Sequence, residues 1–164
     1  MRLLIGTPIE ESKAFCLNRL YRALKNLHVP ENCLVGILFV VTLKPSPRFL
    51  RKVNYVAKRL GETKYAFAGV GMLGDQREGW NRESLERARE TIRQFALNDF
   101  PSDHLWFVDA DNPPPREALI RLLGLGAQVA GGLVYQRMRD DEETYPLVYE
   151  YSGPPPKEPV LRSS

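Results

Sequence analysis

The amino-acid sequence predicts an α/β fold, a three-layer sandwich with helices on both faces of a mostly parallel central sheet. Short apolar runs alternate along the chain with longer segments of helical period, as in chains that build β-α-β units. Two runs, 33–42 and 104–110, are apolar at successive rather than alternate positions, which indicates strands covered on both faces. The chain has 164 residues, enough for one domain with a substantial core.

The predicted elements alternate from the first residues onward. Strands are expected at residues 2–6, 33–42, 64–70, 104–110 and 127–135. Apolar side chains repeat at helical spacing in residues 16–27, 49–60, 85–96 and 119–123, and Gly124 and Gly126 end the last helix. The segment YPLVYEY, 145–151, is compatible with one further strand. We therefore expect a single domain over residues 1–151 and a proline-rich, extended or disordered tail over 152–164.

Composition and charge limit the classes of binding partner and the cellular compartments that are expected for this chain. The formal charge is only +3, and Lys and Arg are interleaved with Glu through most of the helical segments, so we expect no nucleic-acid partner. Cys16 and Cys33 lie in apolar surroundings without metal-ligand spacing and are expected to be reduced. The longest apolar run, 33–43, is about half the length of a membrane-spanning helix, and the N-terminus lacks signal-peptide features. A cytoplasmic protein is expected, with peripheral membrane association left open.

The stretch HLWFVDADNPPPREAL places two carboxylates directly after a buried strand. Ligands of parallel sheets bind outside the carboxyl ends of the strands. In an extended backbone Asp109 and Asp111 point the same way, while Ala110 turns back toward the protein. Two convergent carboxylates repel each other unless a cation lies between them, and their hard oxygens suit Mg²⁺ or Mn²⁺, which also bind phosphate oxygens. Both are therefore candidate metal ligands; the alternative is that Asp111 or Asn112 caps a helix that begins among the three prolines.

The segments LWFVDADNPPPREALIRLL and AQVAGGLVYQR resemble the core of nucleotide-sugar glycosyltransferases with the GT-A fold, family-2-like, in which an Asp-x-Asp motif follows a hydrophobic strand and precedes a proline-started helix. The likeness extends, less sharply, from LLIGTP near the N-terminus to about Arg137. It implies that Asp109 faces the nucleotide ribose or the metal, and that Asp111 binds the Mn²⁺ or Mg²⁺ that bridges the donor diphosphate. The implied activity is a hexosyltransferase-like, inverting transfer from a nucleotide-diphosphate sugar to a glycan, lipid or protein acceptor. A divalent cation would stabilise the charge on the departing diphosphate.

The resemblance also implies donor contacts by position. GTPIEE ends the first strand, where the family places nucleotide contacts, so Thr7, Pro8 and Glu10 are candidates. Asp109, Ala110 and Asp111 of the Asp-x-Asp motif are expected to contact the same donor. The same residues also fit a capping box, with Thr7 as N-cap and Pro8 at the first helical position. Gly131 and Gly132 follow a strand of small residues and would let the donor sugar approach the backbone; a plain β-bulge is the alternative.

The resemblance leaves two further donor contacts unassigned, one after the second strand and one on the third helix. The second strand ends in VTLKPSPRF, where many relatives carry an acidic pair that reads the base; this chain has no carboxylate there, so Thr42 and Lys44 are only positional stand-ins. On the third predicted helix, relatives often direct a basic residue toward the donor. Arg87 and Arg89 lie on that helix, but three glutamates at helical spacing favour a solvated ion-pair face.

An inverting transferase needs a general base to take the proton of the acceptor. The acidic run in RMRDDEETY, beyond the fifth predicted strand, supplies the candidates Asp140, Asp141, Glu142 and Glu143, although a solvated loop explains the same run. The downstream acid and closing segment usual in the family are not recognisable. The acceptor half is therefore very reduced, truncated or completed by a partner.

Other patterns point elsewhere. GVGMLG matches the dinucleotide-binding glycine pattern, but it follows the third strand and no helix opens on its last glycine, so we expect a mobile loop over residues 69–79 near the site, with Trp80 packing on a sugar or on the sheet. Phosphoryl transfer on an aspartate also uses an Asp-x-Asp motif, ordinarily on the first strand, which carries no acid here. A non-catalytic nucleotide- or glycan-binding module on the same fold remains the alternative to an enzyme.

Overall fold

The computed structural model describes residues 1–42, 44–73 and 82–127, together with the strands Val134–Arg137 and Thr144–Leu147. The chain divides into two compact units, Met1–Arg121 and Leu122–Ser164. The single domain over 1–151 stays a prediction, and the tail 152–164 lies outside the described residues.

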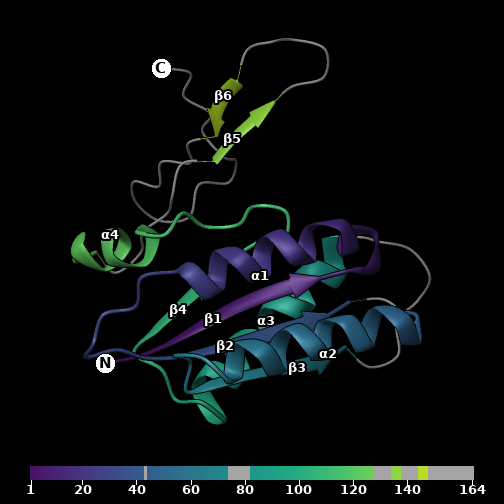
Figure 1. Cartoon of the computed structure of the whole chain (residues 1–164), viewed down its shortest axis with the longest axis horizontal. Coiled ribbons are helices and arrows are strands. Elements are labelled where there is room, and N and C mark those ends of the chain that lie inside the picture. Colours follow the sequence, from purple (N-terminus) through teal and green to yellow (C-terminus); the bar gives the residue numbers. More distant parts are fainter. Residues whose placement is uncertain (43, 74–81, 128–133, 138–143, 148–164) are drawn as a thin grey trace. The chain divides into compact units, whose positions relative to one another are not determined.

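Strand and helix alternate through the first unit, as the sequence predicts (Figure 1). Its four strands are all parallel and lie in the order β3-β2-β1-β4. A short 3-10 helix, η1, precedes α1. The elements are, in chain order, β1 (Arg2–Ile9), η1 (Glu11–Cys16), α1 (Leu17–Asn26), β2 (Leu34–Val41), α2 (Pro47–Gly61), β3 (Phe67–Met72), α3 (Arg82–Asn98), β4 (His104–Phe107) and α4 (Ala118–Gly124).

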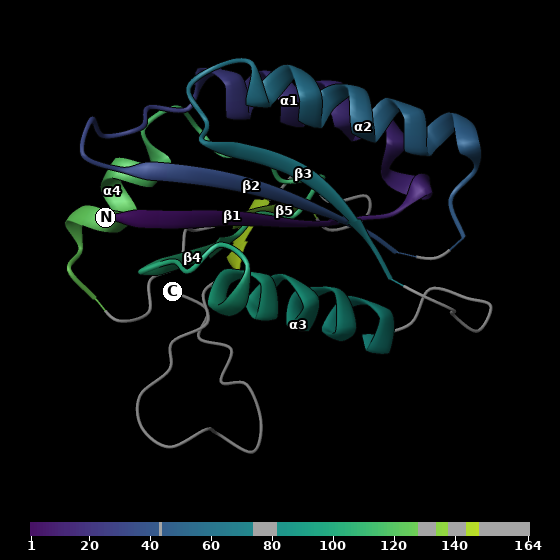
Figure 2. The same cartoon turned by 90° about the horizontal axis from the view of Figure 1, so that it is seen from below.

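Helices cover both faces of this sheet. Figure 2 shows α1 and α2 on one face and α3 on the other, and α1 packs against α2. β1 and β2 are buried at every position after their first residue, because successive side chains of a strand face opposite layers and both layers are covered. The three-layer α/β sandwich with a parallel sheet is thus confirmed.

The α1 and α2 layer is built on apolar stripes. α2 begins at Pro47 because the Oγ of Ser46 accepts a hydrogen bond from the backbone N–H of Phe49 at 3.2 Å and a proline suits the first turn. The Glu11 carboxylate accepts from the backbone N–H of Ser46 at 2.7 Å and from its hydroxyl at 2.6 Å, which lowers the pKa of Glu11. The buried residues of α2 recur at helical spacing: Phe49, Val53, Val56, Ala57 and Leu60.

The α3 layer uses glycines in the sheet instead. A methyl group added to Gly6 would lie 2.2 Å from Cγ2 of Ile92, and one added to Gly36 would lie 3.0 Å from the ring of Phe100. The two glycines therefore leave depressions in β1 and β2 into which side chains of α3 and the loop after it fit. The cluster on this side of the sheet comprises Leu4, Leu38, Val40, Ala88, Ile92, Ala96 and Phe100.

β1 is longer than its partner β4, and this difference opens the sheet beside the site. β1 pairs with β2 from Arg2 to Ile9 but with β4 only from Leu3 to Gly6. The carbonyl of Gly6 accepts from the backbone N–H of Val108 at 3.0 Å, the last backbone bond on that side in the described residues. Pro8, two residues on, directs its backbone to the same side, where a strand has room for a residue without an N–H.

The charge pattern differs between the two layers, and the expected interleaving of Lys and Arg with Glu is wrong for one of them. α3 carries four arginines and three glutamates. α1 and α2 carry no acidic residue at all. Their cations, which together define the α1–α2 face, are Arg19, Arg22, Lys25, Arg48, Arg51, Lys52, Lys58 and Arg59.

Several expected strands have other bounds. The run 69–79, expected to be a loop, is in part a strand, because β3 continues through Gly69 and Gly71 to Met72 in register with β2; Trp80 lies outside the described residues. In the second unit, β5 (Val134–Arg137) pairs antiparallel with β6 (Thr144–Leu147) in a separate two-stranded sheet.

The structure bears on the expected state of the cysteines and on the expected lack of a membrane-spanning helix. Both cysteines are free; Cys16 is buried and Cys33 half-buried. Within the described ranges, no helix combines the length and the apolar character needed to cross a membrane. The cytoplasmic location stays a prediction.

Candidate functional site

The carboxyl ends of the parallel strands surround a pocket of about 390 Å³. Because all four strands run in one direction, the segments that follow β1, β2 and β4 meet at the same edge of the sheet (Figure 2). The residues that line the pocket come from these segments, from η1 and from α3: Pro8, Ile9, Glu10, Lys13, Thr42, Leu85, Asp109, Ala110 and Asp111. The sequence predicted five of them as site residues and Thr42 as a stand-in.

Asp109 and Asp111 lie in a turn rather than in an extended strand. β4 ends at Phe107, and the backbone N–H of Asn112 donates to the carbonyl of Asp109 at 3.1 Å, which closes the turn. The expected strand geometry is therefore wrong. That both side chains point the same way stays a prediction; the structure shows that both line one pocket. All three residues line the pocket, but Ala110 is buried, with 4% of its surface exposed, whereas both aspartates are exposed.

The helix-cap alternative for this motif is wrong. α4 begins at Ala118, beyond the three prolines, and Asp111 and Asn112 are too far along the chain to cap its first turn. Asp111 is instead bound to Lys13, as described next.

Each aspartate forms an ion pair with a cation from another element. Nζ of Lys13, in η1, lies 2.5 Å from Oδ2 of Asp111. A guanidinium nitrogen of Arg89, in α3, lies 3.4 Å from Oδ1 of Asp109. The hydrogen bond to Asp111, followed by its negative charge, raises the pKa of Lys13, so this side chain remains an ammonium at neutral pH.

Arg89 departs from the expected ion-pair face of α3. Its guanidinium bonds Asp109 and lies 5.9 Å from the ring centroid of Phe107 in β4. Arg93 follows the expected pattern instead, with two hydrogen bonds to Glu90 at 2.7 and 2.8 Å. Among the described side chains of α3, Arg89 is thus the basic one that pairs with an aspartate of the pocket.

The segment GTPIEE also folds differently from the capping-box alternative. β1 continues through Thr7 and Pro8 to Ile9, and η1 has Glu10 as its N-cap without a side-chain cap bond. Pro8 and Glu10 line the pocket. Thr7 is fully buried, does not line it, and has no hydrogen-bond partner for Oγ1 among the described residues; its nucleotide contact stays a prediction.

The remaining predicted residues lie elsewhere. Thr42, directly after β2, is buried and lines the pocket, whereas Lys44 is exposed and does not. The sugar contacts Gly131 and Gly132 and the candidate bases Asp140, Asp141, Glu142 and Glu143 lie outside the described residues.

Sequence reasoning missed Lys13 and set Arg89 aside. Lys13 is 98 residues from Asp111 along the chain, and nothing in the local pattern of η1 marks it as a site residue. Arg89 is separated from Asp109 by 20 residues and has glutamates within one helical turn. Only the pairing of β4 beside β1, which places Phe107 next to Gly6, brings these groups together.

Comparison with known proteins identifies the fold. No protein-family model matches the chain, and no curated protein matches it. A crystal structure of S. aureus TarS 1-349 in complex with UDP-GlcNAc is similar with a TM-score of 0.52 at 15% sequence identity, over 76% of this chain and 30% of that one. A second crystal structure of S. aureus TarS 1-349 gives a TM-score of 0.54 at 15% identity, over 91% of this chain and 42% of that one. This chain therefore spans less than half the length of these structures, and it has the α/β fold of glycosyltransferase domains.

Proposed function

We propose that the chain is a GT-A-like glycosyltransferase domain that binds a nucleotide-diphosphate sugar in the pocket beyond β1, β2 and β4. The observation that supports this most is the convergence of Asp109, Asp111 and Glu10 on one pocket at the carboxyl edge of a parallel sheet. The similar TarS structure contains UDP-GlcNAc, which makes this nucleotide sugar the first donor to test.

A divalent cation, Mn²⁺ or Mg²⁺, fits the donor set. In the described part of the chain no group of three or more His, Cys, Asp or Glu side chains could hold a metal ion. Asp109 and Asp111 offer two carboxylates, and Mg²⁺ is commonly held by one or two carboxylates together with substrate phosphates. When bound, such an ion stabilises the negative charge on the departing nucleoside diphosphate.

Lys13 and Arg89 pair with the two aspartates of the pocket, so donor binding is expected to rearrange these ion pairs. Lys13 pairs with Oδ2 of Asp111, so a cation that binds this oxygen has to displace the ammonium. The diphosphate is the natural new partner for Lys13, since both lie in the same pocket and an ammonium binds phosphate oxygens well. Arg89 holds Asp109 toward α3 and orients it at the pocket wall.

Thermal unfolding with UDP-GlcNAc and Mn²⁺, Mg²⁺ or a chelator tests the proposal. A ligand that binds the native state at about 100 times its Kd stabilises by about 2.7 kcal/mol, which raises the midpoint of a chain this size by about 5 to 10 °C. We expect this shift with metal, its loss with chelator, and its loss in Asp111→Asn. The matched control is Asp103→Asn, an exposed aspartate outside the pocket, which should keep the shift.

The possible outcomes distinguish metal-dependent donor binding, metal-independent donor binding and no donor binding. A shift that persists with chelator would show that donor binding does not require a metal ion. Lys13 and Arg89 would then be the groups that neutralise the diphosphate. No shift with any nucleotide sugar would overturn the proposal.

The non-catalytic binding module is the second candidate, favoured by the ion pairs that Asp111 and Asp109 form with Lys13 and Arg89. Release of UDP from UDP-GlcNAc without acceptor, measured by chromatography, would favour the enzyme; binding without release would favour the module. The general base, expected among residues 140–143, and the inversion of configuration remain part of the proposal.

A further inference from the structure

The α1–α2 face carries eight positively charged side chains, none of which lines the proposed donor pocket. All eight of its cations are exposed to solvent. Arg59 is the one member with an ion pair in the described residues, to Glu62 at 3.2 Å. The remaining seven have no described carboxylate within ion-pair distance, so the positive potential of this face is not cancelled locally.

The helical spacing directs these cations outward. Arg19, Arg22 and Lys25 recur every three residues along the side of α1 opposite its buried leucines. On α2, Arg51 and Lys58 lie opposite the buried stripe, and a groove of about 340 Å³ between the two helices is lined by Arg48, Arg51 and Lys52. Both helices therefore present cations to solvent on this face of the sheet.

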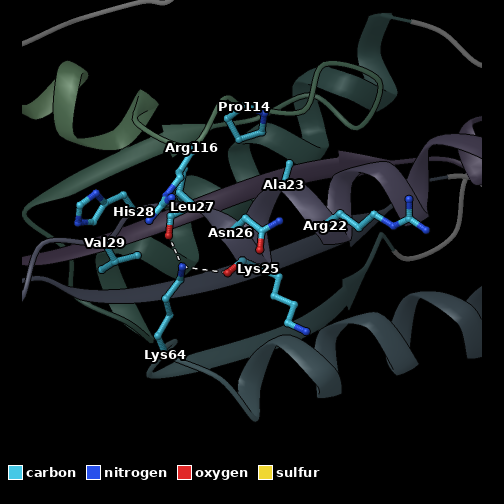
Figure 3. A pocket seen from close by; sticks show the side chains of 10 residues that line it. All are labelled: Arg22, Ala23, Lys25, Asn26, Leu27, His28, Val29, Lys64, Pro114 and Arg116. Atoms are coloured by element: carbon cyan, nitrogen blue, oxygen red, sulfur yellow. Dashed lines mark hydrogen bonds between the residues drawn. The ribbon is translucent and has the colours of Figure 1, made fainter.

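A larger cavity extends this surface at the C-terminal end of α1. It has a volume of about 780 Å³, and Arg22, Lys25, Lys64 and Arg116 are among the residues that line it (Figure 3). Lys64 donates to the carbonyls of Lys25, at 3.0 Å, and of Leu27, and burial together with the charge of Arg116 lowers its pKa.

Among the described residues that line this cavity, none carries a carboxylate. Two lining residues pair with Glu117, which lies 3.1 Å from His28 and 3.7 Å from Arg116. An anionic headgroup entering the cavity would thus meet cations on several sides.

Exposed aromatic side chains accompany the charge. Phe15, in η1 directly before α1, is 77% exposed, and Tyr55, which lines the groove between the helices, is 65% exposed. A bilayer surface offers both phosphates for the cations and an apolar layer for the rings, which is the combination that interfacial segments use. A nucleic-acid duplex offers the phosphates without an apolar layer that exposed rings could enter.

We propose that the α1–α2 face docks the protein on a bilayer containing anionic phospholipids, with Phe15 entering the interface and the cavity at the end of α1 receiving a lipid phosphate. Electrostatic attraction to anionic lipid amounts to about a fivefold gain in partitioning for each Lys or Arg near the surface and falls with salt. This proposal is independent of the donor site, because it needs neither nucleotide nor metal.

Vesicle co-sedimentation of the full chain tests it. We expect binding to vesicles of phosphatidylcholine mixed with phosphatidylglycerol, no binding to phosphatidylcholine alone, and loss of binding as salt rises from about 0.1 M to about 0.5 M. Arg22→Gln combined with Arg51→Gln should weaken partitioning about 30-fold. The matched control, Arg87→Gln with Arg93→Gln, removes the same charge from α3 on the opposite face and should change partitioning less than about twofold.

Phe15→Ala separates lipid from other polyanions. It should lower partitioning into anionic vesicles several-fold and leave the midpoint of thermal unfolding unchanged, because the side chain is exposed. Absence of binding to anionic vesicles would overturn the proposal, as would equal weakening by the two double variants. Tight binding of a single-stranded oligonucleotide without binding to vesicles would replace the lipid with nucleic acid.

Discussion

The two helical layers of the first unit cover the same sheet by different means. α1 and α2 bury long apolar stripes and present an outer surface with cations alone. α3 packs into depressions left by Gly6 and Gly36, has both signs of charge, and sends Arg89 to the site. The layer with both signs of charge thus sends one cation to an aspartate of the pocket, whereas all the cations of α1 and α2 lie in solvent. The charge balance of a helix does not reveal which of its ions serves the site.

The largest effect is expected from the first layer. Phe49 is 1% exposed in α2, so Phe49→Ala should lower the free energy of unfolding by about 3 to 5 kcal/mol through lost burial and a cavity. Tyr55→Ala, on the exposed side of the same helix, should change it by less than about 0.5 kcal/mol. Urea unfolding of both variants measures the contrast. Equal losses would show that α2 does not pack through this stripe.

The α3 layer should respond to added rather than removed volume. Gly6→Ala places a methyl group 2.2 Å from Ile92 and should cost about 1 to 3 kcal/mol. Gly71→Ala is the control, since its nearest neighbour would be 3.7 Å away, and should be close to neutral. In an Ile92→Ala background the cost of Gly6→Ala should largely disappear. Additive costs in urea unfolding would contradict the close approach of α3 to β1.

A smaller effect, with a pH signature, is expected at Tyr65. Its hydroxyl donates to the carbonyl of Leu24 in α1, and Tyr65→Phe should cost about 1 kcal/mol. Burial raises the pKa of Tyr65 above its ordinary 10.0. Because the pKa is higher in the folded state, the contribution is complete below pH 10 and is lost as pH rises through the folded value. The variant should therefore lose less stability above pH 10 in a urea series, whereas Tyr55→Phe should behave like the parent.

The smallest effect belongs to the surface of α3 and has the opposite pH sign. Hydrogen bonds from Arg93 and then Gln94 lower the pKa of Glu90 to about 2 from 4.5. Since the folded value is depressed, the contribution is present above pH 4.5 and is lost as pH falls through about 2. Glu90→Gln should flatten this acid decline slightly, and high salt should remove the difference because the pair is exposed. An unchanged acid profile at low salt would show that the pair adds nothing to stability.

Periodicity predicted the elements well and their ends poorly. The helical stripes and the doubly buried strands follow from local spacing, which is why the sandwich was predictable. The ends depend on partners far along the chain: β4 stops at Phe107 because its pairing with β1 stops at Gly6, and β1 runs on through Pro8 because β2 supplies a partner up to Ile9. A capping box at Thr7 is a local signal that this pairing overrides.

The site divides in the same way. Asp109 and Asp111 were predictable from a short motif after an apolar run, and both line the pocket. Lys13 and Arg89 were not, because their partners are fixed by the order of strands rather than by sequence neighbours. The sequences of α1 and α2 contain basic residues and no acidic ones. The net charge of +3 did not reveal this, because it includes the acidic residues of the rest of the chain.

The proline at the open side of β1 has one more consequence. Unpaired backbone groups at the margin of a sheet can recruit a strand from a second molecule and so begin aggregation. Past Gly6, the margin of β1 toward β4 has Pro8 where an incoming strand would require a donor, so regular pairing there is interrupted. The mouth of the pocket can thus stay open to a small ligand without becoming adhesive toward other copies of the chain.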